Sequence, residues 1–183
     1  MAHHRLFVAI RPPAPVRAQL LGLAIGVPGA RWQSDEQLHC TLRFIGEVDR
    51  HRAEDVVALL GHVRHPEMAL TLGEVGAFKR GGRIDTLWIG IQPREPIKVL
   101  HDKIDRLLDQ AGVTPDARAY LPHITLARFG RSATPHRDVA SRIGPPPRDT
   151  FLATSFELCE SHLASEGAVY ETVARYPLSP ARS

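Results

Sequence analysis

Two short segments of the chain carry histidine and threonine in the same order and at the same spacing. The first reads HCTL from His39 and the second HITL from His123, and a glycine follows each histidine at the same offset. The histidines lie 84 residues apart, close to half of the 183-residue chain. A duplicated lobe explains this repeat better than chance. An imidazole beside a hydroxyl, present twice, can perform acid–base chemistry on a bound anion.

The repeat would place two acid–base groups around one phosphate. Alternate side chains of a strand share a face, so His39 lies beside Thr41 and His123 beside Thr125, with apolar residues behind them. One imidazole can take a proton from water near pH 7 while the other gives one to a leaving alkoxide. The hydroxyls can donate hydrogen bonds to phosphate oxygens. If an approximate two-fold axis relates the lobes, the pairs face each other, and the pattern predicts metal-free phosphodiester cleavage.

Two other interpretations apply to the same residues. A single His-x-Thr on a strand is usually a half-buried histidine beside a β-favouring neighbour, but this explanation has to account for both copies. A two-histidine metal site would need a third or fourth ligand, and neither segment contains a carboxylate. Cys40 would face away from His39 on a strand, which makes it a poor co-ligand. These residues therefore favour metal-free catalysis over a metal site.

The elements that must position these residues follow from hydrophobic periodicity. Apolar residues run together or alternate in strands, whereas in helices they recur every three to four residues. Several neighbouring strands have hairpin spacing, which favours an α+β fold with antiparallel sheets, and no linker divides residues 1–183 into separate domains. The predicted strands are 5–10, 38–45, 68–78, 86–92, 123–129, 151–163 and 169–176, and the predicted helices are 14–25, 49–65, 96–112 and 135–143.

The composition is that of a globular chain with a mild positive charge. Hydrophobic residues make up 43% and charged residues 23%, which excludes a disordered or fibrous chain. The net charge is +3, and arginine greatly outnumbers lysine, which would suit a nucleotide or RNA ligand but also follows from genome base composition. Cys40 and Cys159 are too few for a disulfide scaffold, and we see neither a membrane-spanning run nor a signal peptide. We expect a cytoplasmic protein.

The order of these motifs resembles that of the 2H phosphoesterase superfamily, named for its two His-x-Thr motifs, and above all its RNA 2′,3′-cyclic phosphodiesterases, also called 2′-5′ RNA ligases. The resemblance implies a bilobal fold of two pseudo-symmetric antiparallel sheets, with outer helices around a central groove. It also implies hydrolysis of a terminal RNA 2′,3′-cyclic phosphate to a 2′-phosphate, without a metal or nucleotide cofactor. The matching segments are RLFVA at 5–9, Trp32, LHCTLRFIGEV at 38–48, LWIG at 87–90, PHITLAR at 122–128, SHL at 161–163, Gly167 and Tyr170.

The resemblance implies roles for five residues. His39 matches the general acid that protonates the departing 3′ oxygen, and His123 matches the general base that activates water. Thr41 and Thr125 match the phosphate-binding hydroxyls, and Arg128 matches a phosphate-contacting arginine. Arg128 stands at an odd offset from His123, so on a regular strand it would point away. It reaches the phosphate only if the strand bends, bulges or ends first.

Three more residues are candidates for RNA contact. Phe44 stands where the second copy has Arg128, and it is either an apolar or stacking surface or an ordinary core residue. Arg80 and Arg83 flank the glycine turn of a predicted hairpin, where they would contact an RNA backbone or form a solvated tip.

The predicted activity has alternatives. Other 2H activities use the same chemistry, among them 2′-5′ oligonucleotide phosphodiesterase activity and reversible 2′-5′ RNA ligation. A non-catalytic module that binds RNA ends could share the fold, although the histidine and threonine of both copies are intact. The expected partners are RNA 3′ ends or nucleotides bearing a 2′,3′-cyclic phosphate, with no membrane association, and the expected oligomeric state is a monomer.

Overall fold

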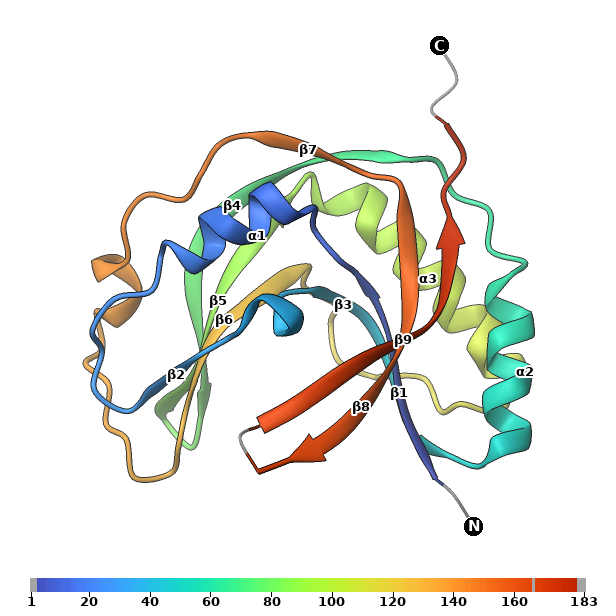
Figure 1. Ribbon diagram of the computed structural model, residues 1–183, viewed down its shortest axis with the longest axis horizontal. Coiled ribbons are helices and arrows are strands. Elements are labelled where there is room, and N and C mark those ends of the chain that lie inside the picture. The colour runs from blue at the N-terminus through green and yellow to red at the C-terminus, as the bar shows by residue number, and fades with distance from the viewer. Residues whose placement is uncertain (1–2, 166, 181–183) are drawn as a thin grey trace.

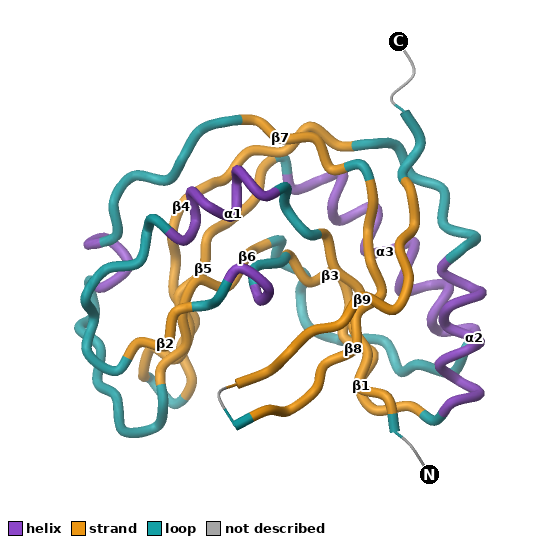
Figure 2. The backbone as a smooth tube through the Cα atoms, in the orientation of Figure 1, coloured by secondary structure: helices purple, strands orange, loops and turns teal. Residues whose placement is uncertain are grey.

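The strands of the chain form one curled antiparallel sheet (Figures 1 and 2). The computed structural model describes residues 3–165 and 167–180. The strand order is β7-β4-β5-β6-β3-β1-β8-β9, and β2 pairs with the end of β6. The predicted α+β class with antiparallel pairing is confirmed. The strands are β1 (His4–Ile10), β2 (Ala30–Trp32), β3 (Cys40–Val48), β4 (Met68–Arg80), β5 (Arg83–Gln92), β6 (His123–Phe129), β7 (Thr150–Ala153), β8 (Ser155–Ala164) and β9 (Gly167–Pro177).

The sheet consists of two half-sheets that meet at one residue pair. β7, β4, β5 and β6 form one half, and β3, β1, β8 and β9 form the other. The register between β6 and β3 is the single pair Cys40–Ile124. The two strands at this junction carry the two copies of the repeat. The pair of pseudo-symmetric sheets implied by the resemblance is therefore present as two halves of one continuous curled sheet.

The helices lie outside the sheet. They are α1 (Ala14–Leu21), α2 (Arg50–Leu60) and α3 (Arg94–Gln110), with short 3₁₀ segments η1 (Asp35–Gln37) and η2 (Val139–Arg142). Asp49 caps α2, because its side chain accepts a hydrogen bond from the backbone of Arg52 at 2.9 Å. In Figure 1, α2 and α3 lie together at one end of the molecule.

Two predicted elements are wrong in extent or type. The predicted helix at 135–143 is only the four-residue η2, because so short a segment between prolines cannot repay the cost of helix nucleation. The predicted strand 151–163 divides at Thr154 into β7 and β8, which pair at opposite ends of the sheet with β4 and β1. Continuous alternation indicates a strand but does not show where the chain changes its pairing partner.

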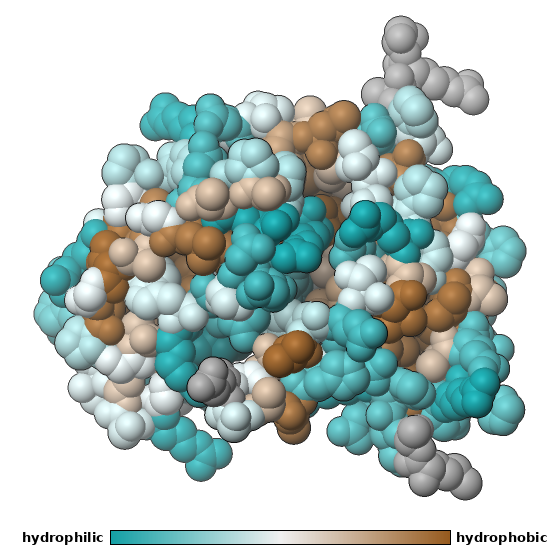
Figure 3. Space-filling model, viewed as in Figure 1, coloured by the Kyte–Doolittle hydropathy of each residue, from teal (hydrophilic) through white to brown (hydrophobic). Residues whose placement is uncertain are grey.

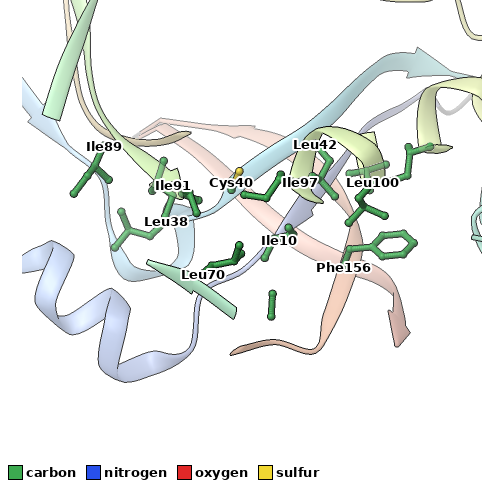
Figure 4. Packing of buried hydrophobic residues seen from close by; sticks show 14 of the residues in the cluster. Ile10, Leu38, Cys40, Leu42, Leu70, Ile89, Ile91, Ile97, Leu100 and Phe156 are labelled. Carbon is green, nitrogen blue, oxygen red and sulfur yellow. The ribbon is translucent and has the colours of Figure 1, made fainter. Parts of the chain in front are cut away.

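The main core fills the space between the sheet and the helices. Figure 4 shows Leu38, Cys40 and Leu42 within this core, to which Ile97 and Leu100 of α3 also belong. The residues of each repeat that alternate with histidine and threonine are thus buried, as predicted from strand alternation.

Strand β1 is buried on both faces, which explains its unbroken apolar run. Leu6, Val8 and Ile10 belong to the main core, whereas Phe7 and Ala9 face the other side, in a small cluster with Cys159. This second face of the sheet is the one that carries the histidines.

The surface mixes apolar and hydrophilic side chains, as the face in Figure 3 shows. The most exposed large apolar side chain is Leu163, near the end of the β8–β9 hairpin. Isolated apolar side chains of this kind are common on folded chains. Within the described ranges, no helix combines the length and the apolar character that a membrane crossing requires.

Candidate active site

The two His-x-Thr segments lie side by side where the half-sheets meet. Strands β3 and β6 run antiparallel, and the register through Cys40–Ile124 sets Thr41 opposite His123 and His39 opposite Thr125. The two paired residues point into the core with no exposed surface. The two histidines and two threonines therefore share the opposite face of the sheet. Tertiary structure thus brings four predicted site residues together from two distant segments.

Each histidine is oriented by a backbone carbonyl two residues before it. Nδ1 of His39 lies 2.7 Å from the carbonyl oxygen of Gln37, and Nδ1 of His123 lies 2.6 Å from that of Leu121. Because a carbonyl oxygen only accepts, Nδ1 carries the proton in both rings, and Nε2 is left to exchange protons. Nε2 of His39 lies 3.0 Å from Oγ1 of Thr41. The two repeats hold their imidazoles in the same way.

The 3₁₀ segment η1 positions the carbonyl that orients His39. Oε1 of Gln37 accepts a hydrogen bond from the backbone of Ser34 at 3.0 Å, and Asp35 accepts one from Nε of Arg17 at 2.9 Å. Neither η1 nor β2 was predicted from the sequence. The Ser-x-x-Gln spacing from Ser34 to Gln37 is a capping-box pattern, and it was the available signal for η1.

A β-bulge brings Arg128 to the face of His123. The pairing between β5 and β6 skips Leu126, so Leu126 and Ala127 are both buried on the core side. Arg128 then returns to the opposite face, which a regular strand would not allow. The sequence allowed a phosphate contact from Arg128 only if the strand bent, bulged or ended, and the structure contains such a bulge.

Strand β3 has the matching bulge in the first repeat. Its pairing with β1 skips Leu42, so Leu42 and Arg43 are both buried, and Phe44 returns to the histidine face with 55% of its surface exposed. The guanidinium of Arg43 is neutralised by Asp105 at 2.5 Å. Phe44 is therefore an exposed aromatic side chain and not a core residue, at the position equivalent to Arg128.

Aromatic rings surround both histidines. The ring of His39 lies 4.9 Å from that of Phe7 and 5.1 Å from that of Tyr170, and the ring of His123 lies 4.9 Å from that of Phe78. These centroid distances are in the range of favourable aromatic contacts. In residues 3–165 and 167–180, no three potential metal-ligating side chains gather into a group.

Trp88 belongs to the surroundings of His123. Its ring lies 6.0 Å from that of His123 and 5.2 Å from that of Phe78. A Cβ atom on Gly76 of the neighbouring strand would come within 2.3 Å of the indole. Gly76 therefore makes room for Trp88 beside the histidine.

Burial lowers the pKa of both candidate catalytic histidines. The pKa of His39 falls to about 4, chiefly because the ring is buried, with the positive charge of Arg128 and smaller effects of His123 and Arg11 added. Burial and Arg128 lower the pKa of His123 as well. Both rings are therefore neutral near pH 7 when no anion is bound.

A cavity of about 500 Å³ opens on the histidine face. Its lining includes Thr41, His123 and Arg128 from the two repeats, together with Phe44 and Arg80. A smaller hollow of about 30 Å³ lies on the other side, beside His39. Thr41, His123, Arg128 and the exposed ring of Phe44 thus meet around the larger space, which is referred to below as the cavity, whereas His39 lines the smaller hollow.

The two hairpin arginines differ in their surroundings. Arg80 lines the cavity, and its Nε lies 3.4 Å from Oδ2 of Asp85. The guanidinium of Arg83 instead donates to the carbonyl oxygen of Ala133 at 2.8 Å and to that of Arg131. Both hydrogen bonds come from Nη2, and Arg83 lies outside the cavity lining, so a contact of Arg83 with RNA stays a prediction.

His101 and Tyr120 line the cavity but were not predicted. The side chain of His101 on α3 is only 12% exposed and stacks on Tyr120, with ring centroids 4.1 Å apart. The hydroxyl of Tyr120 donates to the carbonyl oxygen of Thr41 at 3.0 Å. The sequence does contain a signal that His101 is buried. Its spacing from the buried Ile97 and Ile104 puts all three residues on one helix face.

Comparison with known proteins places this geometry in a family. The model of the 2′-5′ RNA ligase superfamily matches residues 12–166, which include both repeats. The chain is 31% identical over 182 residues to the RNA 2′,3′-cyclic phosphodiesterase of Escherichia coli K12, covering 96% of this chain and 97% of that protein. It is 30% identical over 151 residues to the protein of that name from Aeropyrum pernix, covering 81% and 85%. A crystal structure of E. coli LigT complexed with 3′-AMP superposes with a TM-score of 0.81 and 28% identity, covering 97% and 99%. The chain belongs to the 2′-5′ RNA ligase superfamily.

Proposed function

We propose that the protein is an RNA 2′,3′-cyclic phosphodiesterase that hydrolyses the cyclic phosphate at an RNA 3′ end to a 2′-phosphate. The observation that carries the proposal is the carbonyl contact of Nδ1 in both His39 and His123, which leaves two proton-exchanging Nε2 atoms on one face. Similarity to relatives named for this activity supports it.

The proposed reaction is an in-line displacement at phosphorus. His123 removes a proton from water as the water oxygen attacks, and the bond between phosphorus and the 3′ oxygen breaks. His39 gives its proton to the departing 3′ oxygen, so the products are a 3′-hydroxyl and a 2′-phosphate. General acid–base groups of this kind each contribute roughly 10²–10⁴-fold to rate.

The bound phosphodiester favours the protonated form of His39 that this reaction needs. In the empty site the hydroxyl of Thr41 donates to the unprotonated Nε2 of His39. A phosphodiester beside the ring raises the pKa of His39, because opposite charge favours the imidazolium. Once His39 is protonated, the hydroxyl of Thr41 is released to donate to the phosphate, alongside Thr125 and Arg128. Substrate binding and protonation of the acid are thereby coupled.

Two further parts of the cavity would bind the rest of the RNA end. The exposed ring of Phe44 offers a surface on which the terminal base can stack. Arg80 at the β4–β5 hairpin can contact backbone phosphate, a contact that is independent of base sequence.

We propose that the enzyme is a metal-independent, cytoplasmic monomer. Metal independence is supported by the contacts of the two imidazoles, because Nδ1 of each ring is bound to a backbone carbonyl and aromatic rings pack beside both histidines. The cytoplasm is supported by Cys40 and Cys159, which are both buried free thiols.

The product of an oligonucleotide that ends in a 2′,3′-cyclic phosphate tests this proposal. With EDTA present, we expect many turnovers per enzyme molecule and a 2′-phosphate product, identified by its resistance to a 3′-specific phosphatase. A 3′-phosphate product would contradict the assigned leaving group. Activity that EDTA abolishes and a divalent ion restores would contradict the metal-free mechanism, and stoichiometric binding without product would favour a binding module.

A further inference from the structure

The cavity extends past the residues that the proposed reaction uses. Its far wall is formed by His101 of α3 and by Asp116, Arg118 and Tyr120 of the loop at 111–122. The volume of about 500 Å³ lies within the range of roughly 300–1,000 Å³ typical of sites that bind a whole small molecule. The cavity therefore has room for more than the phosphate that the two repeats surround.

The loop of the far wall is anchored to β3. The hydroxyl of Tyr120 donates to the carbonyl oxygen of Thr41 at 3.0 Å, and the guanidinium of Arg43 donates to the carbonyl oxygen of Thr114. Arg43 is itself buried and paired with Asp105. The strand that carries the first repeat therefore fixes the far wall relative to the phosphate site.

Arg118 presents an oriented guanidinium at this wall. Its Nε and Nη2 donate to the two carboxylate oxygens of Asp116 at 3.0 and 2.7 Å, and its backbone nitrogen donates to the same carboxylate at 3.0 Å. The side chain of Arg118 is 82% exposed. This bidentate pair uses two of the five guanidinium donors, which leaves three for another acceptor.

Planar rings and positive charge accompany this guanidinium. Tyr120 and His101 are stacked in parallel, and both rings line the cavity beside the guanidinium. Apart from Arg43, which is paired with Asp105, arginine or lysine occupies four lining positions of the cavity and aspartate occupies two, so the lining favours an anionic ligand. Rings and cations together favour a nucleotide over a simple anion.

We propose that the far wall binds the second nucleotide from the RNA 3′ end, with Arg118 contacting the phosphodiester that joins it to the terminal nucleotide. Arg118 stands two residues before Tyr120, so along the chain the guanidinium-bearing residue lies at most about 7 Å from the residue that carries the ring. The inference rests on the proposed function and narrows its substrate class to oligonucleotide ends, in preference to mononucleotides.

Three substrates test the inference: a mononucleotide 2′,3′-cyclic phosphate, a dinucleotide with the same cyclic end, and that dinucleotide with a neutral methylphosphonate linkage. A charge-assisted contact predicts a kcat/KM for the natural dinucleotide at least about ten-fold above the mononucleotide. The methylphosphonate should lose most of this advantage. Equal kcat/KM values for all three substrates would overturn the inference while leaving the proposed function intact.

The variant Arg118→Gln should lower kcat/KM for the dinucleotide about ten-fold more than for the mononucleotide. Arg106→Gln, at an exposed position of α3 outside the cavity lining, is the matched control and should leave the ratio unchanged. An equal effect of Arg118→Gln on both substrates would contradict the proposed contact. Failure of the wild-type enzyme to turn over any cyclic phosphate would instead overturn the proposed function, and this inference with it.

Discussion

Phe44 and Arg128 occupy equivalent positions in the two repeats. Each follows a pair of buried residues created by a β-bulge, so both side chains face the cavity. The backbone repeats with approximate two-fold symmetry, but it presents an aromatic ring on one side and a guanidinium on the other. A ligand with a base and a phosphate matches this difference, and replacing each residue should affect binding and chemistry differently.

Replacement of Arg128 should weaken transition-state stabilisation. We expect Arg128→Gln to lower kcat/KM by about 10–150-fold, as for the loss of a charge-assisted hydrogen bond to phosphate. Steady-state kinetics on a cyclic-phosphate oligonucleotide measure this change. Arg31→Gln on neighbouring β2 is a suitable control, and an equal loss in both variants would argue against a specific role for Arg128.

Replacement of Phe44 should affect substrate binding more than turnover. Because base stacking on an aromatic ring is worth about 1–3 kcal/mol, we expect Phe44→Ala to raise KM at least several-fold with a smaller change in kcat. Phe44→Tyr keeps a ring at this position and should restore most of the affinity. A Phe44→Ala enzyme with unchanged KM would show that the exposed ring does not hold the base.

Both histidines should be needed for turnover. His39→Ala and His123→Ala each remove a proton-exchanging group, so each should lower kcat by at least about 10²-fold. His62→Ala, at an exposed position after α2, should remain active. Circular dichroism checks that the variants are folded, and near-normal turnover in either active-site variant would refute the role of that histidine.

Stability should fall in acid because of His39. In the folded chain its pKa of about 4 lies below the ordinary histidine value of 6.5, since burial disfavours the charged ring. Between these two pH values the unfolded chain binds more protons at His39 than the folded chain does. The contribution of the neutral, buried ring to the free energy of unfolding is therefore complete above about pH 6.5, and it is lost as the pH falls towards 4. The full shift corresponds to roughly 3 kcal/mol.

Urea unfolding at pH 7 and pH 4.5 measures this dependence. Wild type should lose more stability between the two values than His39→Asn, in which the titrating ring is absent. Equal losses would mean that His39 titrates normally in the folded state. NMR titration of the His39 ring gives an independent check, because a bound 2′-phosphate nucleotide should raise its pKa.

The substitution Gly76→Ala on β4 should disturb the surroundings of His123 by displacing Trp88 on the neighbouring β5. The added Cβ would lie 2.3 Å from the indole of Trp88, so the ring must move, which should destabilise the fold by about 1–3 kcal/mol and lower kcat. Gly130→Ala is the matched control, since no atom lies within 4 Å of its Cβ, and it should change stability by less than about 0.5 kcal/mol. Thermal unfolding and kinetics of both variants test the comparison, and equal effects would show that Trp88 is not constrained.

The amino-acid sequence alone was sufficient to predict the chemistry-bearing repeat and much of its local structure. Strand 123–129 was predicted with the observed bounds of β6, because alternation places residues on faces through local geometry. The same rule put His39 with Thr41, and His123 with Thr125, on the face away from the core. The charge and composition were compatible with an RNA ligand but did not identify one.

Only the tertiary structure decided how these residues work together. The Cys40–Ile124 pair joins the half-sheets, the two bulges turn Phe44 and Arg128 towards the cavity, and carbonyl oxygens outside the cavity lining bind Arg83. Each of these features depends on contacts between segments far apart in the chain, or on a skipped residue in strand pairing. Hydrophobic periodicity reports which face of an element is buried, but it contains no information about which partner strand lies beside it or where the pairing slips.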